Sequence, residues 1–225
     1  MFFDSIPSMV DVFLVGGAVR DKQLGVGSKD LDFIIHGLSS FELMPKVLHM
    51  LGCEGLPQKG GRREFVLDPV GRMAKAKHPV HGVLDFKMVD NVMRDLKDRD
   101  FTVNAMAIDC RSGLLFDPLK GSVDLQYMQL VPCKSDCFLK SPERLFRALR
   151  FQAKGFNLSQ QLDVLADDSA LLEVVLKANA DRMAQQADKM FADGHAVVIF
   201  QFFAQHPRLA QAIFGSRLQL RSVVR

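Results

Sequence analysis

Two aspartates separated by one residue are the side chains in this sequence best suited to metal chemistry. Asp30 and Asp32 flank the start of a short apolar run, Leu31 to Ile35. If this run is a β-strand, its side chains alternate between two faces, so both carboxylates lie on one face. Adjacent carboxylates repel each other unless a cation lies between them, and Mg²⁺ prefers oxygen ligands. The pair favours a Mg²⁺ site, although Asp-x-Asp pairs are also common on protein surfaces.

A third carboxylate on a neighbouring strand would complete a site for two metal ions, and Asp85 is the candidate. The segment Val83 to Val89 alternates polar and apolar residues, which places Asp85 and Lys87 on its polar face. In such a site one metal ion activates an attacking hydroxyl and the other stabilises a triphosphate leaving group.

A glycine pair precedes the aspartates. Gly16 and Gly17 follow the apolar run Val12 to Val15, so we expect a buried strand that ends in a tight turn. Glycine amides can approach a phosphate closely, and Arg20 one turn later can bind a phosphate oxygen while Asp21 orients it. Glycine pairs usually form only turns, so this signal depends on the aspartates that follow.

Two further polar clusters can contact an anionic ligand. The first contains Arg99, Asp100 and Asn104 among apolar residues, and by itself it reads as an ordinary helix entry. The second is a basic stripe at a spacing of three on a helix that we expect to start at Ser141 and Pro142, formed by Arg144, Arg147 and Arg150. Such a stripe usually faces solvent. The alternative is that it binds the base and a phosphate of a nucleotide.

The elements that carry these residues change character along the chain. The first part predicts mixed α/β structure, with a helix from Ser39 or Ser40 to Leu51 and strands at 12–15, 31–35, 64–67 and 83–89. The apolar segments 105–108 and 114–116 extend either the sheet or its flanking helix. From Ser141 onward the pattern is helical, including helices at 181–192 and 207–214. We therefore predict an α+β head domain at 1–138 and a helical neck domain at 139–225.

Composition limits the class of protein. The 225 residues are 48% hydrophobic and 24% charged, with a net charge of +3, which is typical of a globular protein. No apolar stretch reaches the ~20 residues of a membrane span, and no secretion signal is visible. The four cysteines lack zinc-site spacing and read as reduced thiols. We therefore expect a cytoplasmic protein without membrane contact.

Positive charge is concentrated between Lys59 and Lys87. This stretch holds three acids and seven basic residues, Lys59, Arg62, Arg63, Arg72, Lys75, Lys77 and Lys87. Contact with phosphates and a solvated basic loop explain this distribution equally well.

Together these motifs resemble the class II tRNA nucleotidyltransferase (CCA-adding enzyme) and bacterial poly(A) polymerase family. The resemblance covers Val12 to Phe151 in five ordered motifs: GGAVRD, KDLDF, DRDFTVNAMA, FDP followed by Gly121 and Asp124-Leu125, and PERLFRALRF. It implies a palm like that of DNA polymerase β, a mixed sheet with flanking helices, followed by an all-α neck.

The resemblance also implies residue roles. It implies that Asp30 and Asp32 bind the metals and that Gly17 and Arg20 contact the nucleotide. A second set contacts the sugar, phosphates or base of CTP or ATP: Arg99, Asp100, Asn104, Arg144 and Arg147. The expected activity is addition of C or A to a tRNA 3′ end without a template. A poly(A)-type tailing enzyme and a non-catalytic nucleotide- or RNA-binding relative are the alternatives.

Three departures from the family pattern bear on these roles. Lys140-Ser141 stands where the family has Glu-Asp, so the aspartate that helps to recognise the base is missing. Asp98 replaces the first of two arginines before Asp100, which removes a positive charge near the phosphates. The chain also ends at Arg225, before the family's helical body and tail, so a short member, a different mode of RNA binding and a fragment are all possible.

Overall fold

The computed structural model describes residues 3–28, 30–158, 168–178, 183, 185–186, 188–189 and 196–215. The chain forms two compact units, Met1–Val123 and Asp124–Arg225. The division into a head domain at 1–138 and a neck domain at 139–225 stays a prediction.

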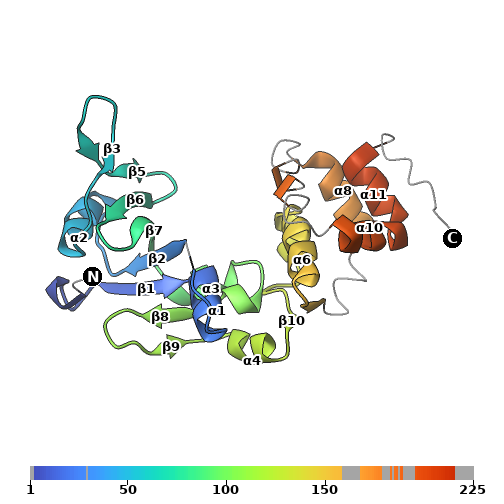
Figure 1. Cartoon of the computed structure of the whole chain (residues 1–225), viewed down its shortest axis with the longest axis horizontal. Coiled ribbons are helices and arrows are strands. Elements are labelled where there is room, and N and C mark those ends of the chain that lie inside the picture. The colour runs from blue at the N-terminus through green and yellow to red at the C-terminus, as the bar shows by residue number, and fades with distance from the viewer. Residues whose placement is uncertain are drawn as a thin grey trace. The chain divides into compact units, whose positions relative to one another are not determined.

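A seven-stranded mixed sheet forms the first unit, in the order β5-β6-β7-β2-β1-β8-β9 (Figure 1). The pair β2 and β7 is parallel, and the other neighbouring pairs are antiparallel. The strands are β1 Asp11–Val15, β2 Leu31–His36, β5 Val66–Asp68, β6 Met73–His78, β7 Gly82–Val89, β8 Ala107–Asp109 and β9 Leu115–Phe116. A separate two-stranded pair is formed by β3 Leu56–Pro57 and β4 Arg63–Glu64.

Short helices connect these strands. Their bounds are η1 Phe3–Ser5, α1 Gly17–Gln23, η2 Phe41–Leu43, α2 Met44–Met50, α3 Val92–Lys97, η3 Thr102–Asn104 and α4 Gly121–Gln126, which crosses into the second unit. One face of the sheet packs into the main core, where the rings of Phe33 and Phe86 stack at 5.2 Å beside Met44 and Leu48 of α2. The predicted alternation along β7 is confirmed, because Leu84 and Phe86 are fully buried. The other face of β2 and β7 carries Asp32, Asp85 and Lys87, together with the buried apolar residues Ile34 and Val89.

Several sequence-based predictions need correction in the first unit. Strand β6 was not predicted, since Met73–His78 alternates charged residues with alanines and carries little apolar signal. The strand expected at 64–67 is divided between β4 and β5, which lie in different sheets. The helix expected from Ser40 to Leu51 starts as η2, where Ser40 Oγ accepts a hydrogen bond from the amide of Glu42, and continues as α2.

The second unit is mainly helical. It contains α5 Cys137–Lys140, α6 Arg144–Ala153, α8 Ser169–Lys177, α10 Ala196–Gln205 and α11 Pro207–Phe214, with a parallel pair of β10 Gln129–Leu130 and β11 Asn157–Leu158. The predicted start of α6 was wrong. Ser141 and Pro142 lie before the helix, in a turn whose carbonyls accept bonds from the amides of Arg144 and Leu145. The helix at 207–214 is confirmed, and the one at 181–192 lies largely outside the described residues.

No helix in the described part of the chain combines the length and the apolar character needed to cross a membrane.

Candidate functional site

A row of charged residues crosses the polar face of the sheet on three neighbouring strands. The register pairs Asp32 of β2 with Asp85 of β7, and Asp85 with Lys75 of β6. Asp30 is exposed and lies directly before β2. The expectation that Asp85 lies on a neighbouring strand beside Asp32 is confirmed. The sequence did not reveal Lys75 as part of this row, because its strand was not predicted.

Asp32 carries the electrostatic signature of a crowded acidic site. Burial raises the pKa of its carboxyl above the ordinary 3.8, and the charges of Asp85 and Asp30 raise it further. Arg99 and Lys75 act in the opposite direction, and their effects are smaller than that of burial. The ionised carboxylate is therefore disfavoured in the chain alone, and a nearby cation would stabilise it.

The oxygen atoms at this point suit a hard divalent cation. Oδ1 of Asp85 is buried and accepts no hydrogen bond from the described residues, while Lys75 Nζ lies 2.6 Å away as an ion pair. Neighbouring carboxylate oxygens are the kind of ligand that Mg²⁺ prefers. Within the described ranges, no three Asp, Glu, His or Cys side chains are already arranged to hold a metal ion.

The glycine turn between β1 and α1 lies against two of these charged groups. Gly16 has φ of 73°, which is a left-handed conformation that favours glycine. A Cβ at Gly16 would lie 3.0 Å from Nη1 of Arg99 and 3.6 Å from Oδ2 of Asp32. The missing side chain thus allows a guanidinium and a carboxylate to approach the same turn. A Cβ at Gly17 would lie 3.4 Å from Nη2 of Arg20.

A chain of hydrogen bonds fixes the guanidinium of Arg20 beside this turn. Its Nε and Nη2 donate to Asp21 Oδ1 at 3.0 and 2.6 Å, and its Nη1 donates to Asn104 Oδ1 at 2.6 Å. Asn104 Nδ2 in turn donates to Asp100 Oδ1 at 3.1 Å, and the amide of Phe101 donates to the same oxygen. Asp100 and Asn104 are buried. The structure therefore brings together two motifs that are more than eighty residues apart.

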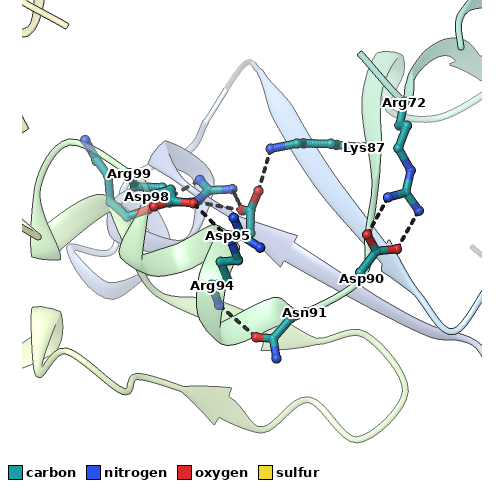
Figure 2. A network of polar contacts seen from close by, with 9 residues as sticks. Arg72, Lys87, Asp90, Asn91, Arg94, Asp95, Asp98 and Arg99 are labelled. Carbon is teal, nitrogen blue, oxygen red and sulfur yellow. Dashed lines mark hydrogen bonds and ion pairs between the residues drawn. The ribbon is translucent and has the colours of Figure 1, made fainter. Parts of the chain in front are cut away.

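Arg99 is held by a residue to which the sequence assigned no role. Asp95 Oδ2 accepts from Arg99 Nη2 at 3.0 Å and Nε at 3.3 Å, and Asp95 Oδ1 accepts from Lys87 Nζ at 2.6 Å (Figure 2). The Asp95 side chain is only 6% exposed. Asp95 lies on α3 and Arg99 just after its end, and their spacing of four residues was a usable signal for this pair. The contact with Lys87 required the position of β7.

The turn between β9 and α4 packs against η3. The carboxylate of Asp117 accepts bonds from the amides of Gly121 and Ser122 at 2.7 and 2.9 Å and from the Ser122 hydroxyl. A Cβ at Gly121 would lie 2.0 Å from the carbonyl oxygen of Thr102. The aspartate-to-glycine spacing of this motif therefore serves close packing of α4 against η3.

The three neck arginines belong to the second unit. On α6, Leu145 and Leu149 are buried as expected, while Arg147 is exposed and Arg144 and Arg150 are half-buried. The structure thus confirms that the arginines and the leucines lie on different faces of one helix. It describes this helix separately from the sheet that carries the aspartates.

Ion pairs use much of the positive charge between Lys59 and Lys87. Carboxylates pair with four of its seven basic residues, in the pairs Arg63–Glu54, Arg72–Asp90, Lys75–Asp85 and Lys87–Asp95. The stretch is therefore partly neutralised within the fold. The four cysteines are free thiols, and burial raises the pKa of Cys53 to about 11 and of Cys110 to about 12.

A family model, similar sequences and similar solved structures all relate this chain to enzymes of RNA 3′-end addition. Residues 67–131 match the family model described as the poly(A) polymerase head domain. The "Multifunctional CCA protein" of Haemophilus ducreyi is 30% identical over 208 residues, which cover 89% of this chain and 50% of that protein. The "CCA-adding enzyme" of Marinobacter nauticus is 33% identical over 161 residues, covering 68% of this chain and 42% of that protein. The chain thus spans about half the length of these relatives.

Solved structures share the fold. The Thermotoga maritima CCA-adding enzyme complexed with tRNA aligns with a TM-score of 0.76 and 24% identity, over 92% of this chain and 49% of that one. A CCA-adding enzyme in complex with CTP aligns with a TM-score of 0.71 and 25% identity, over 86% of this chain and 46% of that one. The mixed sheet with flanking helices is therefore the polymerase-β-like nucleotidyltransferase fold.

Proposed function

Because the chain belongs to the family of class II tRNA nucleotidyltransferases and bacterial poly(A) polymerases, we propose that it is an RNA 3′-end nucleotidyltransferase. It adds C, A or both to the 3′ end of tRNA from CTP and ATP in the cytoplasm, without a template. The observation that carries this proposal is the alignment of Asp32 with Asp85 beside the Gly16 turn and the Arg99 guanidinium. That arrangement places paired carboxylates next to donors for phosphate oxygens.

In the proposed reaction, the 3′-hydroxyl oxygen of the RNA attacks the α-phosphorus of the nucleotide. The bond from that phosphorus to the bridging oxygen breaks, and pyrophosphate leaves. Asp85 accepts the proton of the hydroxyl, since its carboxylate lies on the polar face next to Asp32. A divalent ion, proposed to be Mg²⁺ held by Asp30, Asp32 and Asp85, would activate the hydroxyl and offset the charge of the leaving group.

The donors around the glycine turn hold the nucleotide in this proposal. Arg20 is kept in one orientation by Asp21 and Asn104, so it can bind a phosphate with little further loss of side-chain entropy. Arg99 is kept over Gly16 by Asp95. Gly16 and Gly17 leave room for the phosphates at the turn.

Recognition of the base is assigned to the helical neck. Arg144, Arg147 and Arg150 lie along one side of α6 and present guanidinium groups that can bond to a base edge or a phosphate. Ser141 precedes this helix and offers a hydroxyl where the family pattern has a carboxylate. The choice between CTP and ATP therefore rests on fewer acceptors than the family pattern provides.

Two other functions fit parts of this site. A poly(A)-type tailing enzyme would use the same carboxylates, and the match to a poly(A) polymerase head domain favours it as the second candidate. A non-catalytic nucleotide- or RNA-binding relative is the third candidate, suggested by Ser141. Asp32 argues against the third, because a binding protein gains nothing from a carboxyl whose pKa is raised by partial burial and by the neighbouring charges of Asp85 and Asp30.

A product-length assay with the full chain separates these candidates. Radiolabelled CTP and ATP are supplied separately and together, with varied Mg²⁺, on a tRNA lacking its 3′ end and on an unrelated RNA. We expect one to three additions, on the tRNA only, and none with Asp32→Asn. Long ladders on both RNAs would indicate tailing. Nucleotide binding without incorporation at any Mg²⁺ concentration would refute catalysis.

A further inference from the structure

A lysine forms an ion pair with Asp85, the third carboxylate of the proposed site. Lys75 Nζ lies 2.6 Å from Asp85 Oδ1, on the strand next to the one that carries this aspartate. We propose that Lys75 is an internal counter-cation that competes with a divalent ion for Asp85, so that Lys75 lowers the metal affinity of the site. This inference rests on the proposed function, because it takes Asp85 to be a metal ligand.

The sheet register makes this contact a fixed feature of the fold. Lys75 and Asp85 are directly opposite each other on antiparallel strands, where cross-strand side chains are about 5 Å apart at Cβ. The next residue in the row is Asp32 on β2. The order across the strands is therefore cation, carboxylate, carboxylate, with Arg99 near Asp32 on the far side. Two fixed cations flank the two acids that a metal ion would bridge.

The contact competes with a metal ion for one oxygen atom. Asp85 Oδ1 is buried under the ammonium group, although that group is not aligned for a hydrogen bond. A divalent ion bound to this oxygen and an ammonium group 2.6 Å from it repel each other, so the ammonium group weakens metal binding. The charge of Lys75 also acts on Asp32, since it lowers the pKa of that carboxyl. Metal binding at either acid is thus opposed by the same lysine.

Lys77 provides a matched control on the same strand. It is two residues from Lys75, so it lies on the same face of β6, about 7 Å further along. On β7 residue 77 pairs with Val83, and on its other side its backbone forms a β-bridge to Glu54. Among the described residues the Lys77 side chain forms no ion pair, because the Glu54 carboxylate pairs with Arg63. Replacing either lysine by methionine removes the same charge and keeps most of the apolar stem. A general charge effect predicts similar changes, whereas direct competition predicts a change at Lys75 alone.

The test measures binding of Mn²⁺ to the full chain without nucleotide or RNA. Free Mn²⁺ is counted by its electron paramagnetic resonance signal for the wild type, Lys75→Met, Lys75→Gln and Lys77→Met. Ion pairs of this exposure shift equilibria by about twofold to fivefold. We expect both Lys75 variants to bind Mn²⁺ about three- to fivefold more tightly, and Lys77→Met to stay within about 1.5-fold of the wild type. In an Asp85→Asn background, the gain from Lys75→Met should become smaller, because only the weaker effect of Lys75 on Asp32 remains.

Two results overturn the inference. One is an affinity in both Lys75 variants that equals the wild type or that of Lys77→Met. The other is an unchanged gain in the Asp85→Asn background. Neither of these binding results depends on catalysis, so failure of this inference can be distinguished from failure of the proposed function. A chain that incorporates no nucleotide but shows the Asp85-dependent gain refutes the proposed function alone. A chain that extends tRNA without that gain refutes the role of Lys75 alone.

Discussion

Replacement of Asp95 by asparagine tests whether the site depends on the network that holds Arg99. The Asp95 side chain is 6% exposed and accepts three bonds, from Lys87 at 2.6 Å and from Arg99 at 3.0 and 3.3 Å (Figure 2). Removing one partner of a fully buried ion pair costs about 3–5 kcal/mol. Water can reach Lys87, which is 49% exposed, and Arg99, which is 22% exposed, so we expect about 1–2 kcal/mol here.

The expected stability change is measurable by circular dichroism, since the chain has no tryptophan to report unfolding. For a chain of this length, 1 kcal/mol corresponds to a shift in Tm of about 2–4 °C, so Asp95→Asn should lower Tm by about 2–8 °C. The released Arg99 should also weaken binding of CTP or ATP, measured by calorimetry. A lost charge-assisted contact of about 1.5 kcal/mol predicts a loss of about tenfold.

Asp90→Asn is the matched control for this prediction. Asp90 also accepts two bonds from an arginine, Arg72, at 2.7 and 2.8 Å, but its side chain is 82% exposed (Figure 2). Water can replace those bonds, so Tm and nucleotide affinity should stay close to the wild-type values. The reasoning is refuted if the two variants behave alike, or if Asp95→Asn leaves nucleotide affinity unchanged.

Three further predictions concern stability and reactivity. Because burial raises the pKa of Asp32, its ionised form destabilises the metal-free chain at neutral pH. Asp32→Asn should therefore raise Tm at pH 7, and this gain should shrink as the pH falls toward 3.8; a gain that is independent of pH would contradict the assignment. Gly121→Ala places a Cβ 2.0 Å from a backbone carbonyl and should lower the free energy of unfolding by more than about 2 kcal/mol. Gly27→Ala, whose Cβ meets nothing within 4 Å, should be nearly neutral in the same denaturant titration. Cys53 and Cys110, with pKa values of about 11 and 12, should resist iodoacetamide at pH 8 in the folded chain, as counted by mass spectrometry. Rapid native labelling of either would show that its thiol is not buried.

The local part of the site could be read from the sequence. The alternation of side chains along a strand is a property of the backbone, so it placed Asp30 with Asp32 and separated Asp85 from Leu84 without knowledge of neighbouring strands. The glycine pair marked the turn for the same reason, because a positive φ is a local demand. Family resemblance added the fold. It did not locate the start of α6, where the preceding turn displaced the helix to Arg144.

The tertiary structure decided which of these residues meet. Sheet register depends on hydrogen bonds between segments that are distant in the sequence, and a shift by one residue would move Asp85 to the buried face. Only the parallel pairing of β2 with β7 aligned Asp32 with Asp85, and only the unpredicted β6 placed Lys75 beside them. The sequence by itself therefore determined the acids and the face on which they lie. The fold decided which cations oppose them, because long-range pairing is selected by the packing of the whole sheet.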